Sequence, residues 1–133
     1  MSIERDIPLP WAAASPHSDA TAAAEAVLAA GGNAVDGALA AATLLTVVYP
    51  NQCSAGGDLI ALIGHPDGSV ETVLGIGRSA AAMSRDLLSH ETDQMPVEGA
   101  LTVTVPGVVA AWHEMAARWG TGTLGDSLER AAA

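Results

Sequence analysis

Residues 34–48 form a helix-length segment with almost no polar side chains. Its polar members are Asp36, Thr43 and Thr46, so the helix that it predicts is apolar on nearly every side and needs cover on nearly every side. The chain has 133 residues, of which 28 are alanine, 3 are tryptophan, 1 is tyrosine and none is phenylalanine. Because alanine buries little area, such a chain can hardly cover this helix alone, and we expect more protein around it.

The charged residues exclude several classes of function. The chain has 15 acidic and 5 basic residues, a net charge of −10, and every basic residue is arginine. Without lysine it cannot form a GxxxxGKS phosphate loop, and without clustered positive charge we expect no nucleic-acid partner.

The single cysteine, Cys53, excludes an internal disulfide framework. Because no apolar stretch is long enough to span a bilayer and residues 1–6 do not resemble a secretory signal, we expect no membrane association and a cytoplasmic location.

Two helices are predicted in the first half of the chain. The first begins at Ser18 or Asp19, both of which are good N-cap residues, and ends at the glycine pair 31–32. Asn33 is suited to cap the second helix, and Asp36 follows three residues later at its positive end. The second helix is expected to cover 34–48.

A β-hairpin is predicted next. Residues 59–63 are typical of a buried strand, the turn sequence HPDG occupies 65–68, and 69–74 alternate well enough to return as the partner strand. After the hairpin we expect a glycine-flanked loop at 75–79 and a short extended segment at 101–105.

Two more helices are predicted towards the C-terminus. The first covers 108–119 with one apolar face and ends at Gly120, and the next begins near Thr123 or Gly125. The last helix reaches the final residue without a stop signal, so we expect the chain to be cut inside an element. Without an internal repeat or a linker, residues 1–133 are expected to form one domain or part of one.

Candidate metal ligands are present but lack the usual spacing. His17, Asp19, Asp36 and Asp58 have suitable donor atoms, yet the sequence has no HxH, HExxH or CxxC pattern. We expect structural roles for these residues, no metal site and no cofactor.

Nucleophile and anion-binding motifs are similarly weak. Cys53 has no histidine near it in sequence and fits a packing role, and no GxSxG motif occurs. The glycine pairs 31–32 and 56–57 could present N–H groups to an anion. A helix C-cap explains the first pair better, and close packing or a tight turn explains the second at least as well.

Arg78 is the most informative single charge. It lies in the sequence GIGRS at 75–79, between a predicted strand and a predicted helix, where loops often carry function. Its guanidinium presents a planar fork suited to a carboxylate. A surface arginine without a ligand is the alternative that the residues leave open.

Several short motifs occur in an order and at intervals that resemble one enzyme family. They are SPH at 15–17, GGNAVD at 31–36, TVVYP at 46–50, SAGGDL at 54–59 and VTVPGVVA at 103–110. From about Trp11 onward the chain resembles the N-terminal part of the large subunit of the γ-glutamyltranspeptidase (γ-glutamyltransferase) family. Arg78 falls where that family has an arginine after the hairpin.

The resemblance implies a fold and a reaction. It implies an α+β chain, helix-rich with a β-hairpin, that forms part of an N-terminal nucleophile hydrolase fold (an αββα sandwich), so that 1–133 are an incomplete domain. Such enzymes cleave themselves from a precursor, and a threonine at the new N-terminus of the small subunit transfers a γ-glutamyl group through an acyl-enzyme. The implied partners are the remaining large-subunit segment, that small subunit and a small-molecule γ-glutamyl or related amide substrate.

The resemblance also limits which residues receive a role. It assigns no catalytic residue to this chain, and it implies that Arg78 holds the α-carboxylate of the glutamyl group. Ser79 stands where typical transpeptidases have glutamate. The glycine-rich segment 75–78 is closer to the transpeptidase-like branches of the family and to other amide hydrolases. Two alternatives remain: a non-catalytic scaffold or binding module that forms homo-oligomers, and a small metal hydrolase.

Overall fold

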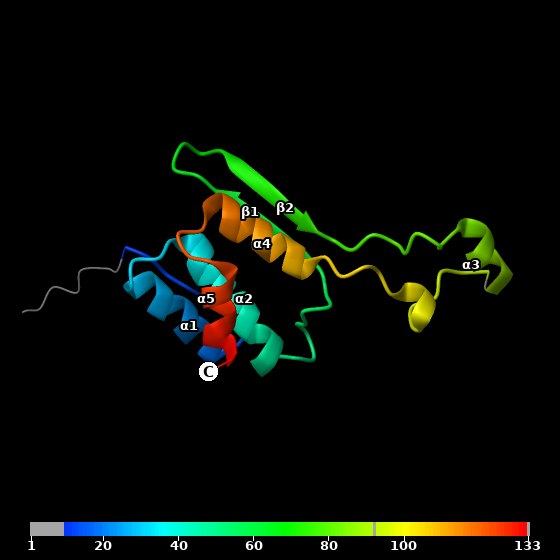
Figure 1. Ribbon diagram of the computed structural model, residues 1–133, viewed down its shortest axis with the longest axis horizontal. Helices are drawn as coiled ribbons and strands as arrows, with labels where there is room; N and C mark the ends of the chain where they lie inside the picture. The colour runs from blue at the N-terminus through cyan, green and yellow to red at the C-terminus, as the bar shows by residue number, and fades with distance from the viewer. Residues whose placement is uncertain (1–9, 92, 133) are drawn as a thin grey trace, which may run out of the picture. The chain divides into compact units, whose positions relative to one another are not determined.

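A computed structural model describes residues 10–91 and 93–132 of the chain (Figure 1). The described elements are helices and one antiparallel hairpin, so the expected helix-rich α+β class is confirmed. The chain divides into two compact units. The helical unit is the described part of Met1–Ser54 and Glu114–Ala133, and the hairpin unit is the described part of Ala55–His113.

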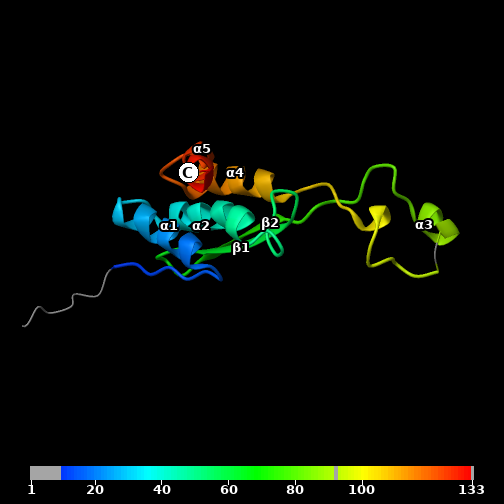
Figure 2. The ribbon, with the colours of Figure 1, turned by 90° about the horizontal axis from the view of Figure 1, so that it is seen from below.

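The helical unit begins with α1, Ser18–Ala29, and α2, Ala34–Val48. Figures 1 and 2 show the two helices side by side. Gly31 has a φ of 94°, a left-handed conformation that glycine adopts without strain, and this confirms the predicted helix stop. The predicted bounds of α2 are also confirmed.

The start of α1 differs from the prediction. The N-cap residue is His17, and its Nδ1 accepts a hydrogen bond from the Asp19 backbone N–H at 3.3 Å. The hydroxyl of Ser18 lies instead beside the Asp19 carboxylate. Propensity favoured Ser18 or Asp19 because their side chains cap most often, but a histidine nitrogen accepts the same bond when the chain enters in extended conformation.

The core of the helical unit forms around α2, which contacts α1 and α5, Leu124–Ala132. Leu39 and Thr43 are the largest fully buried side chains. The Thr43 hydroxyl lies 3.2 Å from the Ser127 carbonyl, which ties α2 to α5. Val47, at the end of α2, is exposed, so the described residues leave part of this apolar helix without cover.

The hairpin unit contains β1, Leu59–Gly64, and β2, Val70–Gly75, as predicted. The HPDG turn closes through the Gly68 N–H and the His65 carbonyl at 2.9 Å. The hairpin is followed by α3, Arg85–Glu91.

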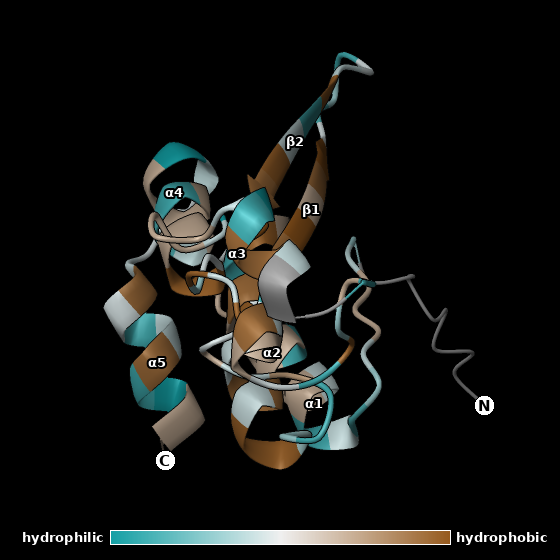
Figure 3. Cartoon of the chain, turned by 90° about the vertical axis from the view of Figure 1, so that its right-hand side faces the viewer, coloured by the Kyte–Doolittle hydropathy of each residue, from teal (hydrophilic) through white to brown (hydrophobic). Residues whose placement is uncertain are grey.

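One face of the hairpin is apolar and exposed. The cross-strand pairs on this face are Ile60 with Leu74, Leu62 with Thr72 and Gly64 with Val70. Ile60, Leu62, Val70 and Leu74 are between 62% and 71% exposed, and we call these four residues the hairpin face. Figure 3 shows the apolar residues along both strands. The prediction that β1 is buried is therefore wrong, because only alternate residues of the strand are covered.

The segment before the third long helix also differs from the prediction. Residues 101–105 were expected to be extended, but Ala100–Thr102 forms a short 3₁₀ helix, η1. The Thr102 hydroxyl donates to the Gly99 carbonyl at 2.8 Å, a local bond that competes with extended pairing. Extended backbone resumes at Val103.

The predicted helix over 108–119 is confirmed as α4, Val108–Trp119, whose residues are shared between the two units. Trp112 and Met115 are buried, and His113 is exposed, as the apolar pattern predicted. None of the helices in the described ranges combines the length and apolar character needed to cross a membrane.

Candidate functional site

Arg78 lies in an irregular segment between β2 and α3, within the hairpin unit. The residue is exposed, and its guanidinium forms no hydrogen bond or ion pair within the part of the chain that the structure describes. Five N–H donors of the guanidinium are therefore available to an external ligand, and a planar carboxylate matches their geometry.

The backbone on both sides of this guanidinium is held by long-range hydrogen bonds. The Gly77 N–H donates to Oδ1 of Asp58 at 2.8 Å. The Val105 N–H donates to the Arg78 carbonyl at 2.8 Å. These bonds join the Arg78 segment to residues 19 positions earlier and 27 positions later in the chain.

Two glycine contacts bring the same backbone segments close together. A Cβ at Gly77 would overlap the carbonyl oxygen of Val105 and the side chain of Thr104. A Cβ at Gly107 would likewise overlap the carbonyl of Gly75. Glycine is required at these positions because backbone packs directly against backbone.

The glycine pair 56–57 anchors the other end of this arrangement. The Gly57 carbonyl accepts hydrogen bonds from the Gly107 N–H at 3.3 Å and from the Val108 N–H at 3.1 Å. The pair therefore joins the loop before β1 to the start of α4. Asp58 follows directly, so its carboxylate extends from a fixed piece of backbone.

Asp36 is the buried carboxylate of the helical unit, with 8% of its surface exposed. Oδ2 accepts the Asn33 N–H at 2.9 Å and the Thr121 hydroxyl at 2.6 Å, and Oδ1 accepts the Thr121 N–H at 2.9 Å. Burial raises the pKa of the Asp36 carboxyl, but the hydrogen bonds from Thr121, Asn33 and Gly122 outweigh it and lower the pKa below its ordinary value. These contacts use its lone pairs, so Asp36 has a structural role.

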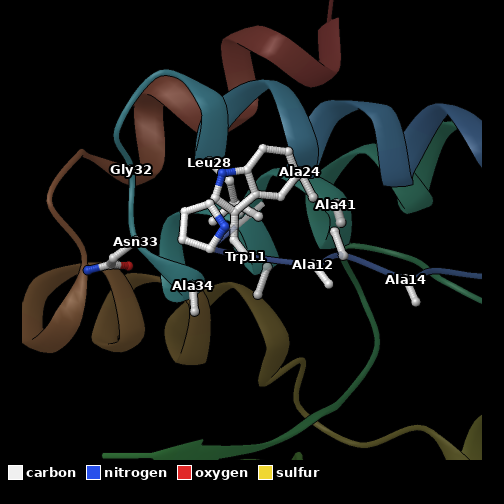
Figure 4. Close-up of a pocket in the computed structure, with 13 residues that line it drawn as sticks. Trp11, Ala12, Ala14, Ala24, Leu28, Gly32, Asn33, Ala34 and Ala41 are labelled. Atoms are coloured by element: carbon white, nitrogen blue, oxygen red, sulfur yellow. The ribbon is translucent and has the colours of Figure 1, made fainter. Parts of the chain in front are cut away.

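One cleft of the helical unit is lined mainly by apolar residues. It has a volume of about 590 Å³, and Trp11, Ala24 and Leu28 are among its lining residues (Figure 4). Asn33 also lines it, but its side chain bonds to the Trp119 carbonyl at 2.6 Å and to the N–H groups that start α2. None of the residues that line this cleft has a side chain that could act as an acid, a base or a nucleophile.

The other residues considered as ligands or nucleophiles lie apart or in structural positions. His17 and Asp19 form the α1 cap, and Cys53 is half-buried in the turn after α2, where its N–H donates to the Tyr49 carbonyl. Within the described ranges, no group of three or more His, Cys, Asp or Glu side chains could hold a metal ion.

The family model described as gamma-glutamyltranspeptidase matches residues 20–133. The chain belongs to the γ-glutamyltranspeptidase family.

Relatives within the family have several names. The chain is 37% identical over 119 residues to a glutathione hydrolase-like YwrD proenzyme of Bacillus subtilis, covering 88% of this chain and 22% of that protein. It is 34% identical over 125 residues to an acylase ACY 1 proenzyme of Pseudomonas sp., covering 86% of this chain and 22% of that protein. This γ-glutamyltranspeptidase-family chain thus spans about a fifth of the length of these curated relatives.

A solved structure shows the same fold. The γ-glutamyltranspeptidase of Helicobacter pylori superimposes with a TM-score of 0.83 at 28% identity, over 91% of this chain and 36% of that chain. The chain therefore has part of the N-terminal nucleophile hydrolase fold, as the motifs implied.

The structure adds residues that the sequence did not single out for this site. Arg78 was predicted from its position after the hairpin, whereas Asp58 was considered as a metal ligand and as part of a motif, and Val105 as part of a motif and of an extended segment. No signal in the sequence pairs residues 58, 77 and 105, because their contacts are long-range backbone contacts.

Proposed function

We propose that this chain is the N-terminal segment of a γ-glutamyltranspeptidase-like amide hydrolase or acyltransferase. The observation that carries the proposal is the exposed Arg78 guanidinium, which extends from a fixed backbone and has no partner among the described residues, in a chain whose family match covers 20–133. The names of the relatives, a glutathione hydrolase-like protein and an acylase, both describe cleavage of an amide or the transfer of its acyl group.

The proposed reaction uses a threonine that lies outside this chain. The hydroxyl of this N-terminal threonine attacks the amide carbonyl of the substrate, and its proton passes to the threonine's own α-amine. The C–N bond breaks, and the amine leaves with that proton. Water or a second amine then attacks the acyl-enzyme ester and restores the hydroxyl. No metal or cofactor takes part.

Arg78 supplies substrate binding in this scheme. Its guanidinium forms paired hydrogen bonds with the α-carboxylate of a γ-glutamyl group, which orients the scissile amide toward the nucleophile. The proposed partners are the remaining large-subunit segment, a small subunit that begins with the threonine, and a small γ-glutamyl or related amide. A cytoplasmic location stays a prediction of the sequence.

The role of Arg78 is tested in the protein that contains these 133 residues, with γ-glutamyl p-nitroanilide as substrate. Because a charge-assisted pair is lost, Arg78→Ala should raise KM by about 10- to 100-fold. Arg78→Lys keeps the charge but loses the fork, so its KM should lie between those of the wild type and Arg78→Ala.

Two controls separate carboxylate binding from general damage. Arg85→Ala removes another exposed arginine of the hairpin unit and should leave KM unchanged. The decarboxylated substrate, 4-aminobutyryl p-nitroanilide, should be hydrolysed equally slowly by the wild type and by Arg78→Ala. Equal KM values for γ-glutamyl p-nitroanilide in the wild type and in Arg78→Ala would contradict the proposal that Arg78 binds the substrate carboxylate.

The hairpin face supports a second candidate function. Ile60, Leu62, Val70 and Leu74 form an exposed apolar surface that a homo-oligomer could also cover. A non-catalytic scaffold predicts a stable oligomer of the 133-residue chain by analytical ultracentrifugation and no second polypeptide in the purified protein.

A further inference from the structure

The backbone around Arg78 needs support because it belongs to no helix or strand. Residues 76–80 have no regular secondary structure, and the side chain of Arg78 is exposed. A guanidinium on an unsupported loop would sample many positions, and ordering it on binding would weaken the interaction with the substrate.

The support comes from one side chain and one backbone amide. The Asp58 carboxylate accepts the N–H of Gly77, the residue before Arg78, at 2.8 Å. On the other side, the Arg78 carbonyl accepts the Val105 N–H at 2.8 Å. The first bond holds the peptide group between Ile76 and Gly77, and the second holds the peptide group between Arg78 and Ser79. Together they restrain the stretch of backbone from which the Arg78 side chain extends.

Asp58 is itself well anchored. Its neighbour Gly57 accepts two hydrogen bonds from Gly107 and Val108 at the start of α4, and Leu59 begins β1. The carboxylate therefore holds the Arg78 segment at a fixed place relative to the start of β1 and the start of α4. The carboxylate thus supplies a side-chain acceptor to the backbone of residues 76–80, which have no regular secondary structure.

We infer that Asp58 is a positioning residue for Arg78. By holding the Gly77 amide, Asp58 sets the affinity with which Arg78 binds the substrate. The inference rests on the proposed function, in which Arg78 binds the substrate carboxylate. Asp58 needs no contact with the substrate. Asp58 holds the Gly77 amide through the oxygen that accepts its N–H. The negative charge of Asp58 contributes less to this role than the position of that oxygen.

Two substitutions of Asp58 separate position from charge. Asp58→Asn removes the charge but keeps an oxygen at the same place, so its KM for γ-glutamyl p-nitroanilide should stay within about twofold of the wild type. Asp58→Ala removes the acceptor, so the Arg78 guanidinium is no longer held in place for the substrate carboxylate. KM should then rise about tenfold, with kcat within about twofold of the wild type. Asp58→Glu keeps the charge but moves the oxygen by one methylene, so its KM should lie between those of Asn and Ala.

A matched control comes from the same hairpin unit. Asp67 accepts the Ser69 N–H at 2.9 Å in the hairpin turn, a side chain–backbone bond of the same kind away from the 76–80 segment. Asp67→Ala should leave KM unchanged. The melting temperatures of all variants show whether each protein is folded, and Asp58→Glu carries the test if Asp58→Ala does not fold.

The decisive comparison is a double-mutant cycle in the protein that contains this chain. If Asp58 acts only through Arg78, the double variant Asp58→Ala/Arg78→Ala should have the KM of Arg78→Ala alone. The inference would be overturned if the increases in KM caused by the two single substitutions multiplied in the double variant. An unchanged KM in Asp58→Ala, when Arg78→Ala raises KM, would also overturn it. An unchanged KM in Arg78→Ala would instead overturn the proposed function on which the inference rests.

Discussion

At the scale of single residues, Asp36 shows how one carboxylate joins two turns. It completes the capping box of α2 with Asn33 and also accepts hydrogen bonds from Thr121 and Gly122, in the turn between α4 and α5. The sequence predicted the first role from the spacing of Asn33 and Asp36. It could not predict the second, because residues 85 and 86 positions away have no local signal.

The lowered pKa of Asp36 has a direct consequence for stability. In the unfolded chain its carboxyl titrates near the ordinary value of 3.8, and in the folded chain it titrates below that value. Its contribution to the free energy of unfolding is therefore full above about pH 3.8 and is lost as the pH falls through the lower folded-state pKa.

Asp36→Asn tests this contribution. The variant should lower the free energy of unfolding by about 2 kcal/mol at pH 7, because the charged acceptor of several hydrogen bonds is lost. The difference from the wild type should shrink below pH 3.8, as the wild-type carboxyl becomes protonated. Urea unfolding at several pH values measures both effects, and a difference that does not change with pH would contradict the explanation.

At the scale of elements, close backbone approach joins the end of β2 to the start of α4. Gly75 in β2 faces Ala111 and the Gly107 carbonyl, and a Cβ there would lie 3.0 Å from that carbonyl oxygen. The sequence predicted the hairpin and α4 from their apolar patterns. It interpreted Gly75 only as a flank of a loop, because a pattern along one segment does not show which other segment packs against it.

Gly75→Ala and Gly64→Ala form a matched pair at the ends of the two strands. Gly75→Ala should lower the free energy of unfolding by about 2 kcal/mol, since the new methyl group has no space. A Cβ at Gly64 meets nothing within 4 Å, so Gly64→Ala should be nearly neutral. Chemical denaturation compares them, and equal losses of stability would show that the close approach is not the cause.

At the scale of the whole molecule, the chain has more apolar surface than its described residues cover. The prediction that α2 needs cover from more protein agrees with exposed Val47, and the hairpin face adds a second uncovered area. The exposed hairpin face was not predicted, because a run of apolar residues such as 59–63 is typical of a fully buried strand. The periodicity of a short apolar run does not show whether one face or both are covered.

The hairpin face predicts how the 133-residue chain behaves alone. It should bind a hydrophobic dye such as ANS and self-associate as its concentration rises, because the apolar area is exposed to water. Replacing Leu62 and Leu74 with threonine should reduce both effects, since threonine keeps strand propensity with less apolar surface. Sedimentation velocity measures the association, and a monomer that binds no dye at any concentration would contradict the prediction.

The central claim is that this chain is one segment of a self-processing amide hydrolase. Denaturing intact-mass spectrometry of the protein purified from its natural source tests it most directly. The proposed function predicts two polypeptides, one that contains these 133 residues and a second that begins with threonine. A single species at the 13.3 kDa mass of this chain would contradict the claim and favour the non-catalytic scaffold.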